Sequence, residues 1–282
     1  MELTNKIAIV IVLYNPNKLD IENVKRLAAY NRGIVVDNSL TPSIDGTSIG
    51  NLQYICNKKN LGIAEAQNIA LRQILQEDYE YIVFIDQDSR ISTDYAKRIQ
   101  NEFIRNVNKN LAIIGPTVIH KENKDEYKSI IHNYGYDCLG FSQRRHIISS
   151  GSCISTQALR EIGLFDGSLF IDYVDFEWCW RAYAKGYKCG ITNKIEIEHK
   201  VGQRELSLGK YKIILSSPER YFYQCRNYFW LIRKKYVPLQ WKIATGIKLI
   251  LRFIYFPILV KGGWTCWKYM AKGIKKGIWQ KK

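Results

Sequence analysis

The stretch Tyr81–Ser89 most constrains the fold, because an uninterrupted apolar run there ends in two carboxylates. The run Tyr81–Ile85 is aromatic or mostly β-branched, which is typical of a central strand of a parallel sheet that is buried on both faces. Asp86 and Asp88 follow, and they project to one side if the chain stays extended. Ligands of open α/β sheets bind beyond the carboxyl ends of the strands. The stretch therefore predicts a site here, with an acidic turn as the alternative.

Two carboxylates held together repel each other unless a positive charge neutralises them. A hard divalent cation that also carries a nucleotide diphosphate would supply that charge. Asp86 and Asp88 are therefore candidate cation ligands.

Other segments of the first half repeat the pattern of a buried strand followed by a helix. No Gly-x-Gly-x-x-Gly and no Walker loop follows any of these strands, which argues against a dinucleotide oxidoreductase and a P-loop enzyme. The alternation predicts an α/β fold with a mostly parallel sheet. The predicted strands are Lys6–Tyr14, Gly33–Ser39 and Leu52–Cys56, and the predicted helices are Leu19–Tyr30 and the segment after Asn60-Leu61-Gly62.

Two predicted turns of the first half carry candidate nucleotide-binding residues. Asp37 could accept a hydrogen bond from N3–H of a uracil or thymine ring, although Asp-Asn-Ser is also good turn chemistry. Asn60 and Gly62 could let the backbone approach a nucleotide closely, with a plain loop before a helix as the alternative.

The middle of the chain is less informative. The segment Leu111–Ile119 is a predicted strand, broken at Gly115-Pro116. The small residues Ser149–Cys153 could form the floor of a pocket. The histidines of this polar region are interpreted as ordinary surface or turn residues, and they are His120, His132 and His146.

Three acids, Asp172, Asp175 and Glu177, cluster among aromatic residues where a helix is predicted from Val174. A helix start favours a carboxylate, which accounts for one acid but not for three. An acid in an aromatic environment has a raised proton affinity and can act as a general base. Further on, His199 ends another predicted strand and is either a structural histidine or a metal ligand.

The charge of the chain is concentrated at one end. Residues 203–282 hold 18 of the 42 lysines and arginines and only 2 of the 26 acids, so they carry the whole net charge of +16. Such a segment binds an anionic surface, either acidic lipid or nucleic acid.

The apolar pattern of this segment favours lipid. Residues 243–260 are apolar except for Thr245, Lys248 and Arg252, which suits an amphipathic helix in a membrane interface better than a spanning helix. A second apolar stripe begins at Trp264 with lysines interleaved. Long aliphatic runs argue against a nucleic-acid surface, so no nucleic-acid partner is expected. An ordinary helical subdomain packed on the enzyme is the alternative.

The cysteines and the N-terminus indicate the compartment. Seven scattered cysteines without a Cys-x-x-Cys pair fit neither a disulfide framework nor a zinc site, so we expect reduced, cytosolic thiols. The N-terminal apolar run is interrupted at Asn15-Pro16 and does not resemble a signal peptide.

Taken together, these residues resemble glycosyltransferase family 2, the inverting, metal-dependent enzymes of the GT-A fold, over residues 6 to about 235. The form of Ile85–Ser89 and of the acidic-aromatic cluster is most similar to the bacterial rhamnosyltransferase branch that builds O-antigen and capsular polysaccharide. The matching segments are Leu13-Tyr14-Asn15, Val36-Asp37-Asn38-Ser39, Asn60-Leu61-Gly62 with Asn68, Asp86-Gln87-Asp88, Gly163-Leu164-Phe165-Asp166, Asp175-x-Glu177 with Arg181, and His199-Lys200-Val201-Gly202.

The resemblance implies a role for each matching residue. Asp88 and His199, with Asp86, would hold Mg²⁺ or Mn²⁺, and Asp175 would be the general base with Glu177 as the acid. Val174 stands where the family often has Glu, so Asp172 remains an alternative base. The implied contacts to the donor nucleotide come from Tyr14, Asn15, Asp37, Asn60, Gly62, Asn68, Asp86 and Gln87.

The resemblance also implies the reaction and its setting. We expect a GT-A catalytic domain over residues 1–210 and a basic helical, membrane-associating region over residues 211–282 at the cytoplasmic face of a bacterial membrane. The donor would be dTDP-rhamnose, with a UDP-sugar as the alternative, and the acceptor a lipid-linked saccharide.

Overall fold

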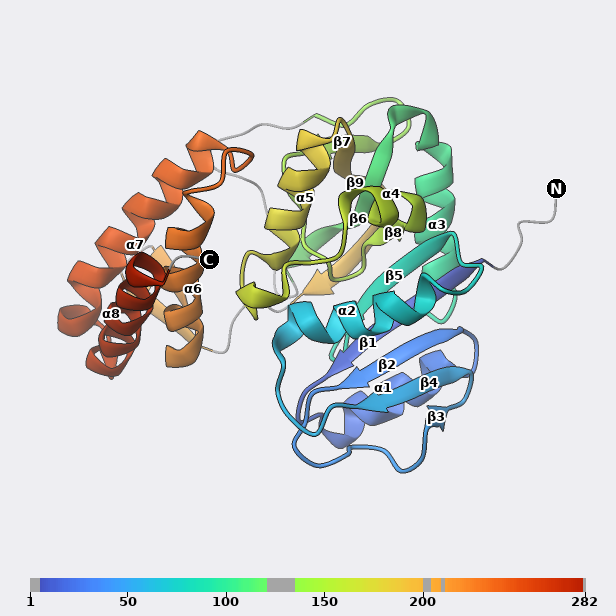
Figure 1. Cartoon of the computed structure of the whole chain (residues 1–282), viewed down its shortest axis with the longest axis horizontal. Coiled ribbons are helices and arrows are strands. Elements are labelled where there is room, and N and C mark those ends of the chain that lie inside the picture. Colours follow the sequence, from blue (N-terminus) through green and yellow to red (C-terminus); the bar gives the residue numbers. More distant parts are fainter. Residues whose placement is uncertain (1–5, 121–134, 200–203, 209–210, 281–282) are drawn as a thin grey trace.

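A computed structural model describes residues 6–120, 135–199, 204–208 and 211–280 and is built around a nine-stranded sheet (Figure 1). The strand order is β3-β4-β2-β1-β5-β8-β6-β9-β7. The strands β3, β7 and β8 run antiparallel to their neighbours, and the others share one direction. The strands are β1 (Ile7–Leu13), β2 (Gly33–Asp37), β3 (Ser48–Ile49), β4 (Leu52–Cys56), β5 (Tyr81–Asp86), β6 (Leu111–His120), β7 (Phe141–Arg144), β8 (Cys153–Ser155) and β9 (Lys188–His199).

Helices cover both faces of this sheet, so the predicted α/β fold with a mostly parallel sheet is confirmed. The alternation of side chains along β5 sends Ile82 and Phe84 to one apolar core, which α2, α4 and α5 cover, and Val83 and Ile85 to another, which α1 and α3 cover. The covering helices are α1 (Lys18–Ala28), α2 (Gly62–Ile74), α3 (Tyr95–Arg105), α4 (Thr156–Ile162) and α5 (Val174–Ala184), and 3₁₀ turns occupy Val107–Lys109 and Gly167–Leu169.

Local sequence sets where several of these elements begin. Asn17 and Asp20 form a capping box before α1, in which the Asn17 side chain accepts from the Asp20 backbone at 3.0 Å. The predicted break of the strand Leu111–Ile119 at Gly115-Pro116 is wrong, because β6 continues through it with a shift of register between Pro116 and Thr117. The strand predicted to end at His199 is also longer than expected, since β9 is continuous from Lys188.

The basic C-terminal segment forms a helical bundle beside the sheet (Figure 1). A hairpin of β10 (Arg204–Leu208) and β11 (Tyr211–Leu215) precedes it, and the expected boundary at residue 210 falls between these two strands. A core that includes Tyr221, Leu249 and Met270 holds the bundle together. None of the described helices is long and apolar enough to cross a bilayer. The bundle helices are α6 (Pro218–Leu231), α7 (Leu239–Leu259) and α8 (Gly263–Trp279).

Candidate active site

The carboxyl ends of three neighbouring strands bring the first group of predicted residues together. β1 lies between β2 and β5, with Leu13 opposite Asp37 and Val12 opposite Asp86. Because these strands are parallel, Asp37 and Asp86 lie at one edge of the sheet, where open α/β sheets bind their ligands.

The turns after these strands are joined by side chains. The Tyr14 backbone N–H donates to Oε1 of Gln87 at 2.8 Å, and that of Asn15 donates to Oγ of Ser39 at 2.8 Å. Asn15 has a left-handed backbone with φ of 45°. Tyr14, Asn15 and Gln87, all predicted to bind the donor nucleotide, therefore form one connected rim.

Asp37 lies under this rim and is fully buried. Its carboxylate accepts from the Ser39 and Ser43 backbone N–H groups at 2.8 and 2.9 Å and from the Tyr54 hydroxyl at 2.6 Å. Burial alone would raise the pKa of Asp37, but these hydrogen bonds outweigh it and lower the pKa below its usual value. Asp37 thus holds the loop after β2 in place as a charged group.

Gly62 and Asn68 connect the first half to the loop before α5. The side chain of Asn60 accepts from the Gly62 backbone at 2.9 Å, and Gly62 has a φ of +81°. A Cβ on Gly62 would lie 2.5 Å from the Phe170 carbonyl oxygen, so only glycine permits this approach. Asn68 exchanges two hydrogen bonds with the Phe165 backbone, at 2.9 and 3.0 Å. In this structure Asn68 therefore links two segments of protein.

The loop before α5 is strained and is held by the bundle. Phe170, Asp172 and Tyr173 all have φ between 65° and 66°, a region that costs free energy for residues other than glycine. Asn227 on α6 provides hydrogen bonds to the backbone of this loop. Its Nδ2 donates to the carbonyl oxygens of Leu169, Ile171 and Asp172. No local sequence pattern indicated this role of Asn227.

The carboxylate of Asp172 is also bound to the bundle. It accepts from Nη2 and Nε of Arg220, at 2.6 and 3.3 Å. Of the two candidate bases, Asp172 is thus the one neutralised by a guanidinium.

Asp175 is half-buried and lies on the first turn of α5. Its carboxylate accepts from the Ser149 backbone at 3.2 Å and from the Phe176 backbone at 2.9 Å. Burial raises the pKa of Asp175 to about 6, against the opposing effect of these hydrogen bonds. The structure thus gives this acid the proton affinity that its aromatic surroundings predicted.

The small residues near Ser149 join Asp175 to the end of β5. Gly151 donates its backbone N–H to the Phe84 carbonyl at 2.8 Å, and Phe84 donates to the Ser152 carbonyl at 3.1 Å. The run predicted as a pocket floor therefore connects the strand that ends in Asp86 with the helix that carries Asp175.

Glu177 points into the protein. It is 1% exposed, accepts from Nε and Nη2 of Arg181 at 2.8 and 3.0 Å, and accepts from the Tyr236 hydroxyl at 2.7 Å. These bonds give Glu177 a structural role between α5 and the segment before α7, unlike the catalytic role that its place in the motif suggested.

The predicted cation ligands are only partly described. Asp88 is exposed in the turn after β5, and Asp86 ends that strand. β6 and β9 run in the same direction as β5, so His199, the last residue of β9, lies at the same edge of the sheet, although its side chain is outside the described residues. Among the side chains that are described, no group of three His, Cys, Asp or Glu residues could hold a metal ion. The two carboxylates fit the oxygen ligands that Mg²⁺ and Mn²⁺ prefer.

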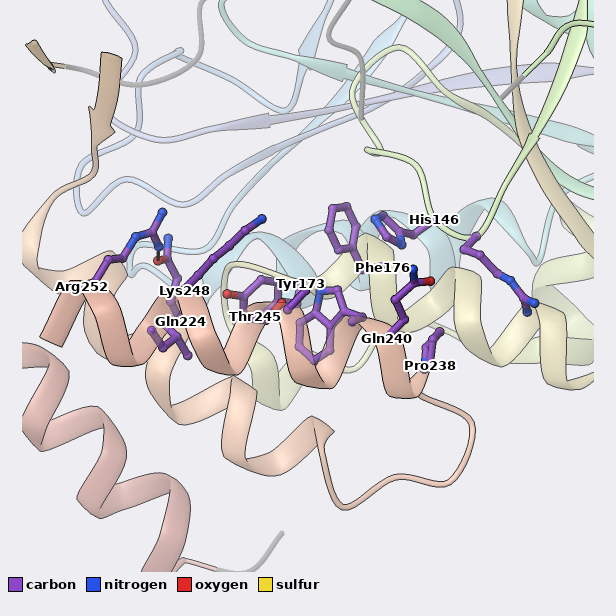
Figure 2. Close-up of a pocket in the computed structure, with 13 residues that line it drawn as sticks. His146, Tyr173, Phe176, Gln224, Pro238, Gln240, Thr245, Lys248 and Arg252 are labelled. Carbon is purple, nitrogen blue, oxygen red and sulfur yellow. Dashed lines mark hydrogen bonds between the residues drawn. The ribbon is translucent and has the colours of Figure 1, made fainter. Parts of the chain in front are cut away.

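A cavity lies between the start of α5 and the bundle, and its lining residues Tyr173 and Phe176 stand on either side of Asp175 in sequence (Figure 2). His146, expected to be an ordinary surface or turn histidine, instead lines this cavity, with its ring centroid 3.9 Å from that of Phe176. Trp241 on α7 also lines it and packs against Tyr173, at 5.0 Å between ring centroids. His120 and His199 have undescribed side chains, and His132 lies outside the described residues.

Comparison with known proteins agrees with this architecture. Residues 81–271 match the family model described as glycosyl transferase family group 2. The chain is 31% identical over 291 residues to dTDP-rhamnosyl transferase RfbF of Shigella flexneri, covering 96% of this chain and 94% of that protein.

Solved structures share the fold at low sequence identity. The S. aureus TarS 1–349 complex with UDP-GlcNAc superposes with a TM-score of 0.55 at 13% identity, covering 96% of this chain and 81% of that one. The chain spans 46% of the longer TarS structure. GalNAc-T7 with UDP, GalNAc and Mn²⁺ also has a TM-score of 0.55, at 12% identity, and this chain covers 54% of it.

The sheet and its solved neighbours show a GT-A fold, and the family match identifies a glycosyltransferase. The chain belongs to glycosyl transferase family group 2 and is similar to its rhamnosyltransferases.

Proposed function

We propose that this protein transfers L-rhamnose from dTDP-rhamnose, with inversion, to a hydroxyl of a lipid-linked saccharide during synthesis of a cell-surface polysaccharide. The observation that carries the proposal is the 31% identity to a dTDP-rhamnosyl transferase over 96% of this chain. The raised pKa of Asp175 supports it, because a carboxyl group with a pKa of about 6 is a competent base at neutral pH.

The chemistry requires one base. Asp175 takes the proton of the acceptor hydroxyl while that oxygen bonds to the anomeric carbon of the sugar. The bond between this carbon and the diphosphate oxygen breaks, and dTDP leaves with the bonding electron pair. Attack from the face opposite the leaving group inverts the anomeric configuration. Asp172 keeps its bond to Arg220 and positions the loop.

Asp86, Asp88 and His199 are the residues that would hold Mg²⁺ or Mn²⁺. A bound cation supplies charge that offsets the negative charge developing on the leaving diphosphate. Asp86 also lies at the rim formed by Tyr14 and Gln87, where the donor nucleotide would bind.

The bundle suggests where the reaction occurs. α7 exposes apolar side chains at helical spacing, among them Ile243, Ile247 and Ile254, with exposed fractions of 56, 53 and 59%. The segment around them carries the whole excess of positive charge. We therefore place the enzyme at an anionic membrane surface, on the cytoplasmic face, as a peripheral protein.

The test is a donor screen with the purified chain. We expect dTDP-rhamnose with Mg²⁺ or Mn²⁺ to raise the melting temperature more than UDP-glucose or UDP-N-acetylglucosamine does, because a ligand bound only by the native state stabilises it. The enzyme should also release dTDP from dTDP-rhamnose, and Asp175→Asn should stop transfer while keeping the thermal shift. A larger rise in melting temperature with a UDP-sugar would identify a UDP-hexose as the donor in place of dTDP-rhamnose. No rise with any nucleotide sugar would reject the proposed glycosyl transfer.

A further inference from the structure

The cavity between the start of α5 and the bundle has a composition that the transfer chemistry alone does not require. Its volume is about 390 Å³, and its walls come from α5, the segment before β8, and α6 and α7. None of the described residues that line it is acidic, although Asp175 lies directly between two of them in sequence. The cavity therefore suits a ligand with negative charge that extends to the start of α5.

One wall of the cavity is aromatic. Tyr173 and Phe176 flank the base along the chain, and Trp241 on α7 lines the same cavity. Trp241 is fixed by its contacts, with ring centroids 5.0 Å from Tyr173 and 4.7 Å from Trp180. Rigid aromatic faces with a few convergent polar groups are typical of a binding site for a small organic ligand such as a sugar ring.

The rim of the cavity is cationic. Lys248 and Arg252 lie one turn apart on α7, and in Figure 2 their side chains extend from the same face of the helix. Arg252 is oriented by donating to Oε1 of Gln224 at 3.2 Å, which leaves other N–H groups for a ligand. Lys248 is exposed and makes no hydrogen bond or ion pair with the described residues. Such a pair suits two adjacent phosphates.

The same helix exposes its apolar stripe on another side. Between residues 241 and 254, the cavity-lining residues of α7 recur at 241, 244, 245, 248, 249 and 252, whereas its exposed large apolar residues recur at 243, 247, 250, 251 and 254. Both sets have helical spacing but differ in phase, so they occupy different sides of α7. A lipid chain attached to a ligand in the cavity would therefore have an apolar surface to follow.

We propose that this cavity is the acceptor subsite, in which Tyr173, Phe176 and Trp241 hold the saccharide of a lipid-linked glycosyl diphosphate and Lys248 and Arg252 bind its diphosphate. The proposal rests on the proposed function, since the sugar hydroxyl must reach Asp175. It adds that the enzyme recognises the diphosphate of its acceptor as well as that of its donor.

The experiment compares two probes, octyl glucosyl diphosphate and octyl glucoside, by titration calorimetry with saturating dTDP and Mg²⁺ to occupy the donor site. We expect the diphosphate probe to bind about tenfold or more tightly than the glucoside, as charge-assisted phosphate contacts allow. Lys248→Gln should remove most of this preference, and Lys248→Gln with Arg252→Gln all of it. Ala244→Phe, which fills the cavity, should weaken the binding of both probes.

Lys275→Gln is the matched control, because it removes one exposed lysine of α8 that does not line the cavity. It should keep the full preference. Equal binding of the two probes, or the same preference in Lys248→Gln and its double variant as in the native protein, would overturn the proposal. The thermal shift produced by dTDP is measured on the same proteins, so a failure of donor binding is read separately and counts against the proposed function instead.

Discussion

Arg220 on α6 donates to both carboxylate oxygens of Asp172, at 2.6 Å from Nη2 and 3.3 Å from Nε. The pair joins the loop that carries Tyr173, and with it the start of α5, to the C-terminal bundle. Three residues of this loop have strained left-handed backbones, so the bundle contributes to the geometry of the site as well as to its surface.

We expect Arg220→Ala to lower the free energy of unfolding by about 1–3 kcal/mol, because it leaves a largely buried carboxylate without its partner. The Asp172 side chain is 9% exposed in this pair. Urea denaturation measures the change. Asp172→Asn with Arg220→Ala should lose less than the sum of the single changes, and strict additivity would contradict coupling between the two residues.

The pH dependence of transfer follows from Asp175. Its pKa is raised to about 6, and a base acts in its deprotonated form, so the rate should rise with pH through about 6 and then level off. Steady-state rates with saturating donor between pH 4.5 and 8 measure this. A rate that is flat down to pH 5 would exclude Asp175 as the base.

The protonation of Asp175 should also make the stability of the folded protein depend on pH. Its contribution to stability should fall with rising pH, whereas the rate of transfer should rise. Because the folded-state pKa of Asp175 lies above the unfolded value, the folded state holds the proton more tightly. The contribution of Asp175 to stability is therefore greatest below its unfolded pKa and is lost as the pH rises through about 6. The Asp175→Asn variant does not undergo this loss. The melting temperature of the variant minus that of the native protein should therefore be larger at pH 8 than at pH 4.5. A smaller difference at pH 8 than at pH 4.5 would contradict the conclusion that burial disfavours the charged form of Asp175.

The local parts of this structure could be predicted from the sequence, whereas its long-range pairs could not. An unbroken apolar run marked the strand Tyr81–Asp86, and aromatic residues at helical spacing marked the helix from Val174. Hydrophobic periodicity describes only which face of an element is buried. Arg220, which binds Asp172, and Tyr236, one of the two residues that bind Glu177, lie 48 and 59 residues further along the chain, at distances that no local pattern specifies.

The same limit explains two wrong or incomplete expectations. Gly115-Pro116 predicted a broken strand, but neighbouring strands hold β6 together through a change of register. The apolar segment after residue 243 was expected to lie on a membrane or to pack on the enzyme, and in the structure α7 packs in the bundle while keeping an exposed apolar side. Tertiary packing decides such cases, since one helix has more than one face.

Metal dependence can be tested at Asp88. We expect EDTA to abolish transfer and Mn²⁺ or Mg²⁺ to restore it, because the leaving diphosphate needs a positive charge. Asp88→Ala should reduce the rate and raise the Mn²⁺ concentration needed for half-maximal activity. Asp78→Ala is a control, since Asp78 is an exposed acid that precedes β5, at the opposite end of that strand from Asp88. Full activity of the metal-free protein would show that Asp86, Asp88 and His199 do not hold a cation that transfer requires.

The exposed stripe of α7 predicts how the enzyme binds membranes. Ile250 and Ile254 are 62 and 59% exposed, so changing both to Glu should leave the fold intact. Each fully buried isoleucine contributes about 1.5–3 kcal/mol to association with an apolar phase, so the double variant should pellet with anionic vesicles at least about tenfold less well. Leu19→Glu with Leu40→Glu is the matched control, because both leucines are at least as exposed, at 65 and 75%, but lie far from the bundle in sequence. Raising the salt concentration should weaken binding of the native protein only in part, since salt screens the lysines and arginines and leaves the apolar contribution. Equal pelleting of the two double variants would mean that α7 does not face the membrane.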